Sequence, residues 1–115
     1  MIPKIDVTTR RRALLKDELH RYLDILIEQY VPDKILLFGS MADDETHAWS
    51  DLDLVIVKKT DKRFLDRIKE VLQLLQPRAG VDILVYTPEE FENLSRDRTF
   101  FREEIIGKGT VLYEK

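Results

Sequence analysis

Three aspartates are the residues of this chain whose type and spacing could do chemistry. Asp51 and Asp53 stand two residues apart in one apolar run, and Asp82 lies in another, between Val81 and Ile83. Residues two apart on a strand project from the same face, about 6.6 Å apart along the strand. Converging carboxylates without thiol or imidazole partners form a hard oxygen site that suits Mg²⁺ and accepts substrate phosphates as further ligands. The three acids therefore predict a magnesium site for phosphoryl chemistry.

Gly39 and Ser40 follow an apolar run and could form a phosphate-binding turn. Glycine lets a phosphate approach the backbone closely, and the serine hydroxyl and amide can donate to phosphate oxygens. Taken alone, a Gly-Ser pair is more often an ordinary turn, and Asp-x-Asp is more often a turn cap that binds nearby amides. The apolar surroundings of the aspartates shift this balance, because acids in a central strand cost desolvation energy unless ions or hydrogen bonds compensate.

The hydrophobic pattern predicts the elements that must position these residues. Helical spacing covers 9–30 and 61–76, and the basic run at 10–12 is expected to face water. Strands are expected at 34–38, 51–57 and 81–86, a capped helix after Thr87, further helix near 97–106 and an edge strand at 110–113.

The connections between these elements predict how the strands pair. A strand, helix and strand in succession make 51–57 and 81–86 parallel, whereas the shorter link makes 34–38 and 51–57 antiparallel. Gly39, Ser40 and the three aspartates then gather at one end of the sheet. The predicted fold class is α/β (α+β), a two-layer sandwich with a small mixed β-sheet covered by helices.

Length and composition exclude several classes of protein. A chain of 115 residues predicts a single domain over 1–115. Nineteen basic against 22 acidic residues give a net charge of −3, which disfavours a nucleic-acid partner held by bulk charge. The absence of cysteine excludes disulfides and thiolate metal sites, and neither an export signal nor a membrane-length apolar run is present. We therefore expect a cytoplasmic protein with no membrane partner.

Four segments together form a longer motif. They are Leu-Phe-Gly-Ser-Met-Ala at 37–42, Asp-Leu-Asp-Leu-Val-Ile-Val at 51–57, Val-Asp-Ile-Leu-Val at 81–85 and the terminal run at 101–113. This combination resembles the signature of the polymerase-β-like nucleotidyltransferase superfamily, in particular its minimal members, the MNT domains. The resemblance implies a nucleotidyltransferase fold in which Gly39 and Ser40 bind a nucleoside triphosphate. It also implies that Asp51, Asp53 and Asp82 bind two Mg²⁺ ions.

The resemblance further implies a reaction and a partner. Asp82 would assist in removing the proton of an acceptor hydroxyl, to which a nucleotide, most simply AMP from ATP, is transferred. Domains of this size resemble antitoxins that pair with a helical HEPN ribonuclease toxin and modify a tyrosine on it. Because 115 residues leave no room for an acceptor-holding domain, a partner protein is expected to supply that surface. The acceptor, the base preference and the oligomeric state, homo-oligomers included, stay open.

A binding module is the alternative interpretation. Family members commonly carry arginine and glycine after the Gly-Ser-x-Ala segment, where this chain has Asp43 and Asp44. Two anions at that place should weaken nucleotide binding unless another Arg or Lys compensates. In this alternative the fold neutralises its partner by masking it, and the carboxylates bind metal without turnover or are vestigial.

Overall fold

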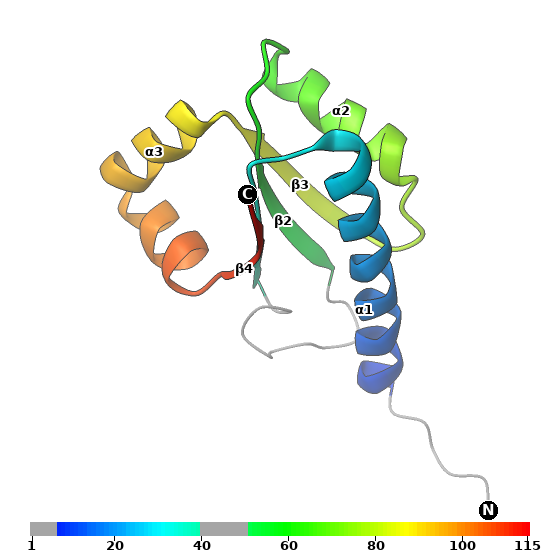
Figure 1. Ribbon diagram of the computed structural model, residues 1–115. Coiled ribbons are helices and arrows are strands. Elements are labelled where there is room, and N and C mark those ends of the chain that lie inside the picture. The colour runs from blue at the N-terminus through cyan, green and yellow to red at the C-terminus, as the bar shows by residue number, and fades with distance from the viewer. Residues whose placement is uncertain (1–6, 40–50) are drawn as a thin grey trace, which may run out of the picture.

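A four-stranded mixed sheet forms the centre of the protein (Figure 1). The computed structural model describes residues 7–39 and 51–115. The strands lie in the order β3-β2-β1-β4 and comprise β1 (Lys34–Phe38), β2 (Leu52–Val57), β3 (Val81–Tyr86) and β4 (Thr110–Glu114). β1 is antiparallel to β2 and to β4, whereas β2 and β3 are parallel. The predicted pairings are confirmed, and Asp51 lies one residue ahead of β2.

Helices cover both faces of this sheet (Figure 1). α1 (Val7–Ile25), its π-helical continuation η1 (Leu26–Tyr30) and α2 (Phe64–Leu75) enclose the larger core together with alternate strand residues such as Leu54. α3 (Pro88–Asp97) and the π-helix η3 (Phe101–Gly107) cover the other face over a smaller cluster that includes Val55. The small mixed sheet covered by helices is the predicted α+β fold class, with additional helical cover from α3 and η3.

Two helix ends lie where proline and capping residues in the sequence favour them. The first helical segment ends at Tyr30 and is capped by Val31, which has a left-handed φ of 53° and directly precedes Pro32. α3 begins with the predicted capping box: the Glu90 amide donates to Thr87 Oγ1 at 3.2 Å, and the Thr87 amide donates to Glu90 Oε1 at 2.8 Å. These caps fix where the chain leaves one layer and enters the next.

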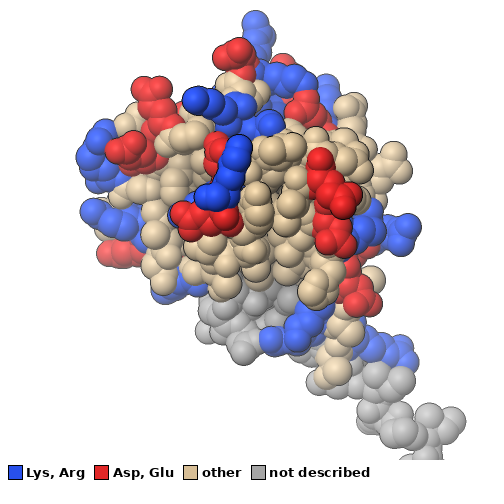
Figure 2. Space-filling model, in the orientation of Figure 1, with Lys and Arg blue, Asp and Glu red and all other residues tan. Residues whose placement is uncertain are grey.

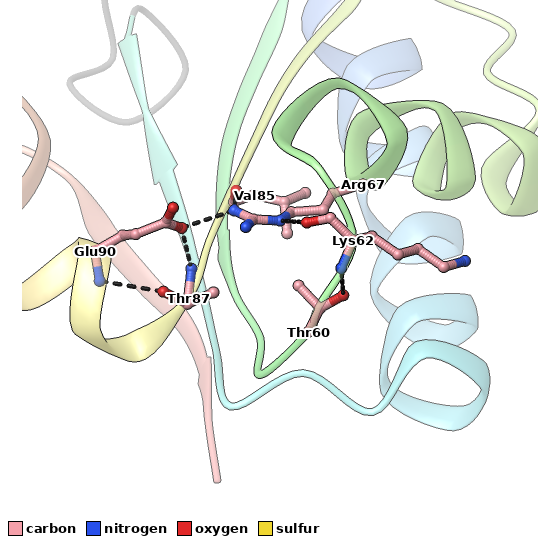
Figure 3. A network of polar contacts seen from close by, with 6 residues as sticks. All are labelled: Thr60, Lys62, Arg67, Val85, Thr87 and Glu90. Carbon is pink, nitrogen blue, oxygen red and sulfur yellow. Dashed lines mark hydrogen bonds and ion pairs between the residues drawn. The ribbon is translucent and has the colours of Figure 1, made fainter.

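A buried arginine joins three elements at the end of the sheet where β3 finishes (Figure 3). Arg67 of α2 is only 7% exposed, in a helical stripe that is otherwise apolar. Its guanidinium donates to the Lys62 carbonyl at 2.7 Å, to the Val85 carbonyl at 3.2 Å and to Glu90 Oε1 at 2.7 Å. Because its charge and hydrogen bonds are matched in this way, the burial of Arg67 is tolerated.

The described surface mixes charges of both signs. On the face shown in Figure 2, acidic and basic side chains are interspersed around a central area of uncharged residues. Within residues 7–39 and 51–115, no helix has the length and apolar character that crossing a membrane would require.

Candidate active site

Asp53 and Asp82 lie side by side at the end of the sheet where β2 and β3 begin. The two strands pair in parallel register, so that Asp53 stands opposite Asp82. Burial is the main cause that raises the pKa of Asp53 to about 7, followed by its hydrogen bond with Asp82 and by the charges of Asp82 and Asp51. Asp53 therefore takes up a proton far more readily than a free carboxyl group, because burial and the neighbouring acids disfavour its charged form.

Gly39 closes the side of this pair that faces β1. The antiparallel register places Phe38 opposite Asp53, and Gly39 follows with a φ of +76°. A Cβ at this position would overlap a carboxylate oxygen of Asp53, so both the backbone conformation and the available space require glycine. Gly39 thus lies against the acids as the sequence predicted, whereas Ser40 and the pair Asp43 and Asp44 lie outside the described residues.

Asp51 lies close to this pair but is held by a cation from α1. Arg11 donates through its terminal nitrogen to Asp51 Oδ1 at 2.8 Å, and the two side chains are 22% and 46% exposed. The same carboxylate packs against Gly80, where a Cβ would overlap Oδ1. Asp51 is near enough for its charge to contribute to the raised pKa of Asp53. The structure therefore brings all three predicted acids to one end of the sheet, with one of them neutralised by Arg11.

The donor chemistry of this end of the sheet fits a divalent cation. Across residues 7–39 and 51–115, no group of three or more His, Asp or Glu side chains is arranged around a single metal position. The available donors are carboxylate oxygens, which Mg²⁺ prefers, and the glycines at 39 and 80 let the carboxylates of Asp53 and Asp51 lie directly against the backbone. A cation bound here would offset the carboxylate charges that contribute to the raised pKa of Asp53.

A family model that matches most of the chain establishes the family of the protein. Residues 21–115 match the family model described as polymerase beta nucleotidyltransferase, a range that includes Gly39 and all three aspartates. The chain belongs to this nucleotidyltransferase family. The superfamily predicted from the motif is thereby confirmed. No curated protein matches the chain at a significant level.

Two solved structures share the fold of this nucleotidyltransferase. A Sulfolobus solfataricus protein described as "a putative nucleotidyltransferase" has a TM-score of 0.68 at 16% identity, covering 100% of this chain and 94% of that one. A chain from a toxin–antitoxin structure with AMP-PNP has a TM-score of 0.51 at 17% identity, covering 84% of this chain and 73% of that one. At these identities the two matches confirm the nucleotidyltransferase fold.

Arg11 is the site residue that the sequence interpretation missed. The basic run at 10–12 was expected to face water; Arg10 is exposed, but Arg11 and Arg12 are partly buried. The signal was present in the spacing, because Arg11 lies one helical turn before the fully buried Leu15 and on the same side of α1. Arg11, at the N-terminal end of the buried face of α1, therefore places a positive charge beside the aspartates.

Proposed function

We propose that this nucleotidyltransferase transfers AMP from ATP, in a Mg²⁺-dependent reaction, to a hydroxyl group on a partner protein. The observation that carries the proposal is the in-register pair of Asp53 and Asp82 beside Gly39. The raised pKa of the partly buried Asp53 supports a functional site, because perturbed carboxyl groups are common at such sites and a bound cation would relieve the repulsion from the neighbouring acids. The family match supports nucleotide transfer as the reaction.

Each residue has a role in this proposal. Asp51, Asp53 and Asp82 would hold two Mg²⁺ ions, which supply charge neutralisation at the attacking and leaving oxygens. Gly39 and Ser40 would bind the triphosphate through backbone amides and the serine hydroxyl.

The two paired acids differ in solvent exposure, and this difference suggests which of them acts as the base. Asp82 is exposed and Asp53 is partly buried, so Asp82 is the acid that an acceptor hydroxyl can reach. It would accept the hydroxyl proton while the oxygen bonds to the α-phosphorus and the bond to pyrophosphate breaks. Asp53, which stands opposite Asp82 in the parallel register, would serve as a metal ligand and not as the base.

The proposed partner is a HEPN-type toxin, with this chain as its cytoplasmic antitoxin. Two observations support the pairing: the resemblance of the motif to MNT domains and the fold shared with a chain from a toxin–antitoxin structure with AMP-PNP. A single domain over 1–115 would present its acids at the sheet end, and the toxin would bring the acceptor hydroxyl to them.

Mass spectrometry of the partner tests the proposed transfer. The toxin-like product of the neighbouring reading frame, incubated with ATP, Mg²⁺ and this protein, should gain about 329 Da per AMP. Asp82→Asn keeps the size of the side chain but loses its charge, so the rate should fall by at least about 10²- to 10⁴-fold. Asp97→Asn is the matched control, because Asp97 is an exposed acid on α3. The control should transfer AMP at the wild-type rate.

The masking module is a second candidate that one observation favours. Arg11 neutralises Asp51, and within the described chain no three acids are grouped around one metal position. This alternative predicts that the wild type adds no mass from any of the four nucleotides and still neutralises its partner as well as Asp82→Asn does.

A further inference from the structure

The ion pair between Arg11 and Asp51 joins α1 to the acidic end of the sheet. Its 2.8 Å contact is a charge-assisted hydrogen bond between residues 40 positions apart in the chain. Asp51 is one of the acids that the proposed function assigns to metal binding. Because a guanidinium stays protonated at every physiological pH, Arg11 can leave this carboxylate only by moving away from it.

α1 is anchored to the rest of the fold about two helical turns beyond Arg11, so we expect Arg11 to move mainly by a change of its side chain. Glu18 is 4% exposed and accepts hydrogen bonds from Arg21 at 2.8 Å and from the Arg78 amide at 3.0 Å. Arg21 in turn donates to the Leu75 carbonyl at 2.6 Å, at the end of α2. These bonds tie the helix to the loop that leads into β3. A long, partly exposed arginine on this anchored helix can reach more than one acceptor at the sheet end.

We propose that Arg11 is a built-in counter-ion that holds Asp51 in the metal-free protein and contacts nucleotide phosphates once a metal ion has taken Asp51. This inference rests on the proposed function, because it assumes a nucleotide at the same end of the sheet. A divalent cation and a guanidinium compete for the charge of one carboxylate, so metal binding weakens the hold of Asp51 on Arg11. The released guanidinium suits phosphate, with which it forms paired hydrogen bonds.

The sequence explains why such a cation is needed from α1. Between Gly39 and Asp51 the sequence carries the acids Asp43, Asp44 and Glu45 and no lysine or arginine. Arg11 precedes the range 21–115 that matches the family model, so it would be a phosphate-binding residue that this chain supplies from outside that range. It would bring to the nucleotide a positive charge that the segment 40–50 does not carry.

The exchange predicts two effects of opposite sign when Arg11 is removed. In Arg11→Gln the competitor for Asp51 is absent, so Mn²⁺ alone should bind about three- to fivefold more tightly. The same variant lacks the phosphate contact, so ATP in saturating Mn²⁺ should bind about tenfold more weakly. A merely structural role for Arg11 would weaken both, because a distorted sheet end would bind neither ligand well.

Calorimetry on the isolated full chain tests this inference without any partner protein. Mn²⁺ is titrated alone, and ATP is titrated at saturating Mn²⁺, into the wild type, Arg11→Gln and Arg11→Lys. Arg10→Gln is the matched control, because Arg10 is an exposed arginine of the same helical turn, and it should bind like the wild type. Arg11→Lys keeps the charge but not the paired donors, so its Mn²⁺ affinity should stay near that of the wild type while ATP binds more weakly.

The outcomes separate this inference from the proposed function. Tighter Mn²⁺ binding together with weaker ATP binding in Arg11→Gln supports the exchange, even if the wild type transfers no nucleotide and the proposed function fails. Unchanged affinities, or a loss of both, in a variant whose circular dichroism matches the wild type overturn the exchange while leaving AMP transfer standing. A wild type that binds neither Mn²⁺ nor ATP overturns both.

Discussion

Asp53 and Asp82 stand opposite each other on two parallel strands, and burial together with the neighbouring carboxyl groups raises the pKa of Asp53 to about 7. The raised pKa of Asp53 gives this end of the sheet a measurable dependence on pH. A metal ion bound as proposed would compete with the proton of Asp53 for the same carboxylate.

The metal-free protein should lose thermal stability as the pH rises from about 4 to about 7 and above. The folded pKa of Asp53, about 7, lies above its ordinary value of 3.8, so the folded chain binds more protons than the unfolded chain between these values. The stabilisation is complete below the ordinary pKa and is lost as the pH passes the folded one. Asp53→Asn should flatten this fall, and millimolar Mg²⁺ should offset it at pH 8 in the wild type.

Melting temperatures from pH 5 to 8, in chelator and in Mg²⁺, measure this effect. Glu92→Gln, at an exposed acid of α3, controls for the loss of one carboxylate. If the melting temperature falls equally steeply with pH in the wild type and in Asp53→Asn, the acid pair is not the source of the pH dependence.

Gly39→Ala should destabilise the protein by about 1–3 kcal/mol and weaken its response to Mg²⁺. The backbone at Gly39 has a φ of +76°, which is strained for alanine, and the new Cβ would overlap an oxygen of Asp53. Urea denaturation with and without Mg²⁺ measures both effects. Gly107→Ala is the control, because the nearest atom that its Cβ would meet, the Arg102 carbonyl oxygen, lies at 3.4 Å. Equal losses in the two variants would contradict a specific role for Gly39.

The placement of the aspartates could be predicted from the sequence, because it follows from rules of backbone geometry. Alternation along β2 and the parallel pairing of β2 with β3 are sufficient to put Asp53 beside Asp82. The contact of Arg11 with Asp51 could not be predicted in the same way. It depends on how α1 crosses the sheet and on the directions of two side chains, neither of which periodicity specifies. For the same reason, the pattern of α2 did not indicate that Arg67 would find three acceptors in the interior.

Arg67→Met should destabilise the fold by about 2–4 kcal/mol without changing Mn²⁺ affinity. The variant keeps the length of the side chain but leaves the Lys62 and Val85 carbonyls and Glu90 without their donor (Figure 3). The network lies at the end of the sheet opposite to the aspartates, which is why the metal site should be spared. Urea denaturation and Mn²⁺ titration measure the two quantities. Arg96→Met, on the exposed side of α3, should change neither.

Glu90→Gln separates charge from hydrogen bonding in the same network. Burial alone would raise the pKa of Glu90, but hydrogen bonds from the Thr87 amide and from Arg67 outweigh it and lower the pKa. Glutamine keeps an acceptor for either donor and loses the charge, so it should cost less stability than Arg67→Met. An equal or larger loss in Glu90→Gln would mean that the ion pair, and not the set of hydrogen bonds, dominates.

Glu18→Gln should lower stability at pH 7 by about 1–3 kcal/mol, with a difference from the wild type that shrinks in acid. Hydrogen bonding from Arg21 is the main cause that lowers the pKa of Glu18 to about 2, below its ordinary value of 4.5. A lowered folded pKa means that the stabilisation is complete above the ordinary pKa and is lost as the pH falls toward 2. Urea denaturation at pH 7 and pH 3 measures the change, with Glu28→Gln, an exposed acid of η1, as control.

Glu18 also accepts a hydrogen bond from the Arg78 amide and so ties α1 to the loop before β3. Its loss should therefore make α1 less firmly held near Asp51. A difference that is the same at both pH values would show that packing, and not the Glu18 charge, anchors the helix.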